Sequence, residues 1–118
     1  MTLDELLARK ARIPKPTVYC LCGSTTRAIA AFESEHLRLT LAGAIVLTIG
    51  AAKNDRDLGI TAEQAINLDI LHLFKIEQAD IIRILNVGGY IGESTRRELE
   101  YAHRLGKRIE FLEEMSTL

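Results

Sequence analysis

The sequence lacks a strong excess of charge, and it lacks a long apolar run. It has 15 basic and 16 acidic residues, which leave a formal net charge of −1, and no basic stretch with interleaved aromatic residues occurs. The charge therefore gives no reason to expect a nucleic acid polymer as a partner. No uninterrupted apolar segment approaches the roughly 20 residues that cross a bilayer, so we expect no membrane partner. The N-terminal segment MTLDELLARKAR carries acidic side chains and no continuous apolar core, unlike a signal peptide.

Cysteine is also scarce, because Cys20 and Cys22 are the two in the chain. They alternate within an apolar run and would share one face of a strand, in a geometry too constrained for the two to pair with each other. No other ligand lies at a metal-binding spacing from them, which argues against a zinc site. We therefore expect reduced, buried thiols in a cytoplasmic protein. We also expect no metal and no other cofactor.

The rest of the composition is that of an ordinary globular domain, with 47% hydrophobic and 26% charged residues among 118. This length predicts one domain, residues 1–118, with a modest core. Residues 1–16 would form its N-terminal helix and lead-in. Hydrophobic periodicity and β-rich segments predict helices over 2–11, 25–41, 61–78 and 95–105, and strands over 17–24, 44–50, 80–87 and 107–113.

Local signals set the ends of the predicted helices. Thr2 with Glu5 has the spacing of a capping box, and so does Thr61 with Gln64. Glycines at 43 and 106 are placed to end two helices. In the helix over 25–41, apolar residues recur at helical intervals and predict the buried face: Ile29, Phe32, Leu37 and Leu41.

Strands that alternate with helices predict an α/β fold. The expected architecture is a three-layer sandwich, in which helices cover both faces of a parallel sheet of four, possibly five, strands. Loops that follow the strands of such a sheet emerge at one edge, and ligands bind where the strand order reverses. Residues 22–24, 50–60 and 86–95 should meet there. These loops are richer in glycine and polar residues than the opposite connections, which is the first indication of a site.

The segment NVGGYIGESTRRELEYA, residues 86–102, contains the most informative of these loops. Gly88, Gly89 and Gly92 permit tight turns or the close approach of a ligand. Ser94 and Thr95 lie where the first N–H groups of a helix and its dipole favour an anion such as phosphate.

A second candidate anion site follows the first strand. Gly23, Ser24, Thr25 and Arg27 begin the helix predicted over 25–41. Serine and threonine at helix starts are also common caps, so capping and phosphate binding both remain open for these two loops. Their convergence on one sheet edge favours a phosphate site.

Glu98 has two interpretations. It follows Thr95 by three residues, which is the spacing of reciprocal capping partners. The same ionised carboxylate is suited to attack or stabilise an anomeric carbon. Asp69, His72 and Lys75 form a polar stripe on the helix over 61–78. A solvated surface explains this stripe, and so does a site in which Asp69 and His72 orient sugar hydroxyls or relay a proton.

These segments resemble the nucleoside 2-deoxyribosyltransferase-like family, which includes the 2'-deoxynucleoside 5'-phosphate N-glycosidases. The resemblance covers residues 18–111 and rests on CGS, GAIVLT, QADII and GES followed by ELEYAHRLGKRI. The loop VGGYIGESTRRE is also similar to the PGGxGTxxE element of the lonely-guy phosphoribohydrolases. The resemblance implies a flavodoxin/Rossmann-like fold, a homo-oligomer whose neighbours complete each site, and Glu98 as the nucleophile, by its distance to Lys107.

Two positions depart from the family pattern. The family often has a tyrosine where this chain has Cys20, and it has an aspartate where this chain has His72, with Asp69 one turn earlier. The resemblance implies hydrolysis or base exchange at the N-glycosidic bond of a (deoxy)nucleoside or its 5'-monophosphate, a small-molecule partner. The alternative is a non-catalytic nucleotide-binding module of the same fold. Expected catalytic residues are Glu98, Asp69 and His72, and expected substrate- or phosphate-binding residues are Gly23, Ser24, Arg27, Gly88, Gly89, Gly92, Ser94 and Thr95.

Overall fold

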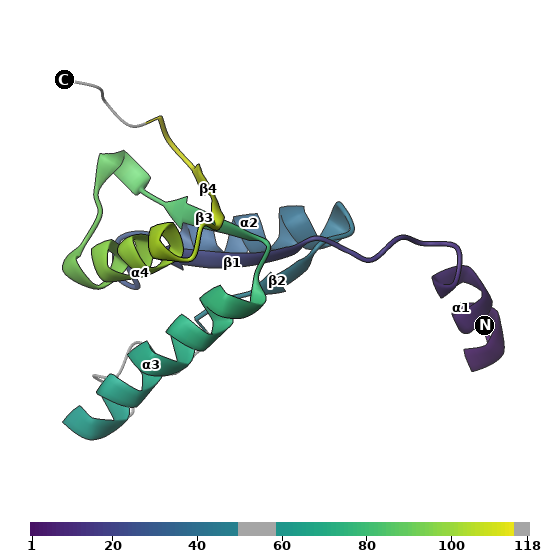
Figure 1. Cartoon of the computed structure of the whole chain (residues 1–118), viewed down its shortest axis with the longest axis horizontal. Helices are drawn as coiled ribbons and strands as arrows, with labels where there is room; N and C mark the ends of the chain where they lie inside the picture. The colour runs from purple at the N-terminus through teal and green to yellow at the C-terminus, as the bar shows by residue number, and fades with distance from the viewer. Residues whose placement is uncertain (50–58, 115–118) are drawn as a thin grey trace.

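The computed structural model, which describes residues 1–49 and 59–114, contains one four-stranded parallel sheet (Figure 1). Its strand order is β2-β1-β3-β4. The strands are β1 (Val18–Gly23), β2 (Ile45–Leu47), β3 (Ile81–Leu85) and β4 (Arg108–Phe111). The predicted α/β fold with a parallel sheet is therefore confirmed, with four strands in the described part of the chain.

Helices cover both faces of the sheet, as expected for a three-layer sandwich. Their bounds are α1 (Leu3–Lys10), α2 (Ile29–Leu41), α3 (Ala62–Gln78) and α4 (Glu93–Arg104), and a short 3₁₀ helix, η3 (Val87–Gly89), follows β3. Cys20 and Cys22 pack with residues of α3 and α4 on one face. Leu21 packs with Phe32 and Leu39 of α2 on the other. Alternation along β1 thus sends its cysteines to the α3/α4 side.

The predicted helix ends are largely confirmed. The Thr2 side chain accepts a hydrogen bond from the backbone N–H of Glu5, and Thr61 and Gln64 form a complete capping box. Gly43 and Gly106 follow α2 and α4 with φ angles of 96° and 69°, a region that glycine adopts without strain.

Two helix starts differ from the prediction. α2 begins at Ile29 instead of residue 25, because residues 25–28 form a turn in which Ser24 Oγ accepts the backbone N–H of Arg27. α4 begins at Glu93, two residues earlier than expected, with Gly92 as its N-cap. Ser24 therefore caps a turn, and Thr95 lies inside a helix.

The predicted buried face of α2 is mostly wrong. Phe32 is buried, but Ile29, Leu37 and Leu41 are exposed, and the helix instead buries Glu35 and Leu39. The reason is an ion pair from the sheet: Arg83 Nη2 of β3 lies 2.7 Å from Glu35 Oε1. A paired carboxylate tolerates burial, so the helix turns this polar residue inward.

The N-terminal helix lies away from the sheet. Figure 1 shows α1 at the end of an extended segment, and no residue of α1 is buried. Its leucines therefore do not contribute to the core of this chain. Across residues 1–49 and 59–114, no helix combines the length and the apolar character that crossing a membrane requires.

Candidate functional site

The loops after β1 and β3 meet at the point where the strand order reverses. They enclose a hollow of about 220 Å³. Its lining residues are Gly23, Ser24 and Thr25 after β1, and Tyr90, Gly92, Glu93, Ser94 and Thr95 around the start of α4. Parallel α/β sheets bind ligands at this position. Of the third predicted loop, residues 50–58 lie outside the described residues.

Not every residue expected to bind phosphate lines this hollow. Gly88 and Gly89 lie in η3 with φ angles of 64° and 77°, where they form a turn that glycine favours. The backbone N–H of Gly88 donates a 2.7 Å hydrogen bond to Glu113 Oε2, so a carboxylate of the chain already occupies this donor. The Arg27 guanidinium stacks 4.0 Å from the centroid of the Tyr90 ring, which places a cation beside one wall of the hollow.

A larger hollow of about 450 Å³ lies between α3 and α4. Among its lining residues are Asp69 of α3 and Ser94 and Glu98 of α4. Asp69 Oδ2 lies 3.8 Å from Arg97 Nη2. Ser94 lines both hollows, so the two are neighbours. This volume is within the range of small-molecule sites.

The three residues of the polar stripe predicted on α3 have different surroundings in the structure. Asp69 faces the larger hollow, and Lys75 Nζ donates a 2.6 Å hydrogen bond to the Thr48 carbonyl oxygen. His72 is only 2% exposed, so the interpretation as a solvated surface is wrong for this residue. The three side chains therefore do not form one site.

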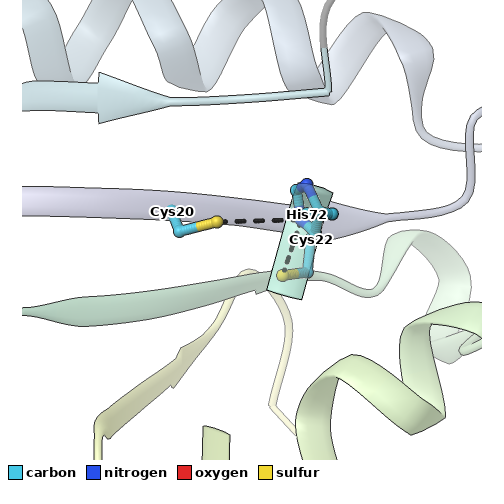
Figure 2. Close-up of side chains that lie close together, drawn as sticks. All are labelled: Cys20, Cys22 and His72. Atoms are coloured by element: carbon cyan, nitrogen blue, oxygen red, sulfur yellow. Dashed lines mark hydrogen bonds between the residues drawn. The ribbon is translucent and has the colours of Figure 1, made fainter. Parts of the chain in front are cut away.

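On the face of the sheet that α3 and α4 cover, the His72 side chain contacts both cysteines of β1 (Figure 2). Its Nε2 atom lies 3.3 Å from Cys22 Sγ and 3.7 Å from Cys20 Sγ. The same nitrogen lies 3.7 Å from Glu98 Oε2. Both cysteines are fully buried, and Glu98 is 3% exposed. We refer to Cys20, Cys22, His72 and Glu98 as the buried cluster.

The position of Glu98 contradicts its interpretation as a helix cap. α4 begins at Glu93, so Glu98 lies beyond the first turn, and the cap of this helix, Gly92, makes no side-chain hydrogen bond. The carboxylate instead points inward to His72 at one side and borders the larger hollow at the other.

The thiols have an environment unlike that of an inert buried cysteine. A hydrogen bond with Cys22, together with a hydrogen bond and the charge of His72, lowers the pKa of the Cys20 thiol to about 6, although burial and Glu98 raise it. Both cysteines are free of disulfides, as expected.

Sequence reasoning missed the histidine partner of the cysteines. His72 is 50 positions from Cys22 along the chain, and the contact depends on how α3 packs against β1. One signal was present: His72 stands between Leu71 and Leu73, within an apolar stretch of the helix. A histidine within such an apolar stretch faces the core more often than one among polar neighbours.

Comparison with known proteins does not assign the chain to a family, because no family model and no curated protein matches the sequence. The resemblance to the nucleoside 2-deoxyribosyltransferase-like family therefore stays a prediction.

Proposed function

We propose that this chain cleaves or exchanges the N-glycosidic bond of a (deoxy)nucleoside or its 5'-monophosphate, with Glu98 acting at C1'. One observation carries the proposal: Ser94 lines both hollows, and Glu98, one helical turn later, borders the larger one. A nucleotide that spans the two hollows would put its phosphate near the start of α4 and its sugar near Glu98.

The smaller hollow suits a phosphate group in both size and donors. Ser24, Ser94 and Thr95 supply hydroxyls, and the N-terminus of α4 supplies backbone N–H groups and the positive end of the helix dipole. Gly92 at the N-cap has no side chain to block the approach. Glu93 also lines the hollow, but its side chain is 89% exposed, so it can turn to solvent.

In the larger hollow, Glu98 and Asp69 have different tasks in the proposed reaction. Glu98 attacks or stabilises C1' as the C1'–N bond breaks and positive charge develops there. The departing base takes a proton from water, and water or a second base then bonds to C1'. Asp69 lines the same hollow, with Oδ2 3.8 Å from Arg97 Nη2, and is placed to accept hydrogen bonds from sugar hydroxyls. His72 is buried beside Glu98 and acts as a positioning residue for that carboxylate.

We also propose that the chain forms a homo-oligomer. α3 has four large apolar side chains that are each about half exposed: Ile66, Ile70, Leu71 and Phe74. Ile66 and Ile70 line the larger hollow, which a second copy would close. Exposed apolar side chains gathered on one element are typical of association surfaces.

The test is release of free base from a panel of ribo- and deoxyribonucleosides and their 5'-monophosphates, followed by chromatography. Glu98→Gln should lower the rate at least about 100-fold, the scale of losing one positioned catalytic group. Glu100→Gln is the matched control, because Glu100 lies on the same helix, lines the same hollow and is 62% exposed in its side chain. Addition of a second free base separates exchange from hydrolysis.

The proposal is wrong if Glu98→Gln releases base as fast as the unmodified protein. A nucleotide that raises the melting temperature but is never cleaved would favour the non-catalytic binding module instead.

A further inference from the structure

The buried cluster brings three potential metal ligands together, with a carboxylate beside one of them. Cys20 Sγ, Cys22 Sγ and His72 Nε2 all lie within 4.8 Å of one another. They come from a central strand and from α3, and Glu98 Oε2 of α4 lies 3.7 Å from the same histidine nitrogen. Figure 2 shows both cysteine side chains directed at the His72 ring.

The separations match those of ligands around one ion. Metal–sulfur bonds of about 2.3 Å and metal–nitrogen bonds of about 2.0 Å place the sulfur and nitrogen of a tetrahedral site roughly 3.5 Å apart. The observed distances from His72 Nε2 are 3.3 Å to Cys22 Sγ and 3.7 Å to Cys20 Sγ. The ligand atoms therefore need only small movements to take up the ion.

A hydrogen bond from His72 Nε2 can reach only one of the two sulfurs at a time. The Nε2 atom of an imidazole carries at most one proton and directs it along one line. Both sulfurs nevertheless lie close to it, at 3.3 Å and 3.7 Å. A cation between these atoms would engage the nitrogen and both sulfurs at once.

We propose that Cys20, Cys22 and His72 bind a Zn²⁺ ion. Two thiolates and an imidazole favour zinc over Mg²⁺ or Ca²⁺, which prefer oxygen. All three side chains are buried, and they leave a fourth position for water or for Glu98, whose Oε2 lies 3.7 Å from His72 Nε2.

Zinc at this position explains how α3 is held on the sheet. This helix has 17 residues, yet it buries only His72 and Ile76. So little apolar burial provides weak attachment. A metal bond to His72 would fix the middle of α3 to β1.

The zinc proposal goes beyond the proposed function and does not depend on it. The two sites are neighbours, because Glu98 lies 3.7 Å from His72 Nε2 and also borders the larger hollow. Metal content is measured without any substrate, so failure of one proposal leaves the other standing.

The experiment measures zinc per chain by mass spectrometry after Zn²⁺ loading and desalting of the full-length protein. We expect about one zinc per chain. Cys22→Ser and His72→Ala should each lose most of the metal, whereas His103→Ala, a change at an exposed histidine of α4, should retain it. Glu98→Gln should still bind zinc, at least about 10-fold more weakly.

A second measurement covers the case in which the cluster variants fail to fold. Co²⁺ added to the unmodified protein should give thiolate charge-transfer bands and the intense visible bands of tetrahedral cobalt, and EDTA should lower the melting temperature of the zinc form. Absence of equimolar zinc and of the cobalt bands in the unmodified protein overturns the proposal. Equimolar zinc in folded Cys22→Ser or His72→Ala protein also overturns it, because the ion would then lie elsewhere.

Discussion

Replacement of Gly23 by alanine tests whether the packing at the end of β1 depends on a missing side chain. Gly23 ends β1 and pairs with Leu85 of β3. A Cβ atom at Gly23 would lie 3.0 Å from Leu85 Cβ, 3.2 Å from the Leu85 carbonyl oxygen and 3.4 Å from Phe32 Cε2. Two of these atoms are fixed by the paired strands, so relief requires the strands or Phe32 to shift.

The magnitude follows from overpacking of a well-filled core, which typically costs about 1–3 kcal/mol. We expect the free energy of unfolding to fall by about 2 kcal/mol. With an unfolding entropy of roughly 2.1 cal/mol/K per residue, this loss lowers the melting temperature of a chain this size by roughly 8 °C.

Gly92→Ser is the matched control, because Gly92 lines the same hollow and also has a negative φ angle, −77°. Its nearest neighbour would be the Tyr90 hydroxyl at 3.3 Å, the end of a side chain that can move. Serine is also a favoured N-cap, so this variant should be as stable as the unmodified protein or more so. Urea denaturation followed by circular dichroism compares the two variants. The reasoning is refuted if their unfolding free energies differ by less than about 0.5 kcal/mol.

Two further predictions concern the other sheet face and the exposed side of α3. Burial raises the pKa of Glu35, but hydrogen bonds from Arg38 and Arg83 outweigh this effect and hold the pKa below its usual value of 4.5. The ionised carboxylate therefore stabilises the fold above pH 4.5, and this stabilisation is lost as the pH falls through the folded-state pKa. Glu35→Gln should therefore lower the unfolding free energy by about 1.5–3 kcal/mol at pH 7. Urea titrations should show that the difference in unfolding free energy between the variant and the unmodified protein shrinks in acid. A difference that does not depend on pH contradicts the mechanism. If the proposed association through α3 holds, Phe74→Asp should shift the protein to smaller species in light scattering, whereas Leu41→Asp, at a 78% exposed position on α2, should not. Equal masses for both variants would contradict the proposed association through α3.

The parts of the fold that local chemistry determines could be predicted from the sequence. Thr61 and Gln64 cap α3 through their own side chains and backbones, and Gly43 ends α2 because its φ angle is positive. The inward face of α2 could not be predicted in this way. It depends on Arg83, which is 48 positions from Glu35 and reaches it only in the folded sheet.

The same distinction applies to the candidate site. The topology of a parallel sheet was enough to predict that the loops after β1 and β3 meet, because strand order and loop direction are linked. The buried cluster depends instead on the rotation of α3 about its axis, which brings His72 rather than Leu71 against β1. Hydrophobic periodicity does not resolve that rotation, since α3 is apolar on several sides.

Cys20 and His72 are the two positions at which the sequence departs from the family it resembles, and they lie together in the structure, with Cys20 Sγ 3.7 Å from His72 Nε2. Under the zinc proposal, both residues supply a ligand to the same ion. Under the proposed function, Asp69, which lines the larger hollow, meets the substrate. Glu98 belongs to both settings, because its Oε2 lies 3.7 Å from His72 Nε2 and the residue borders the larger hollow. The two proposals together therefore predict that a bound ion and a bound ligand affect each other through Glu98.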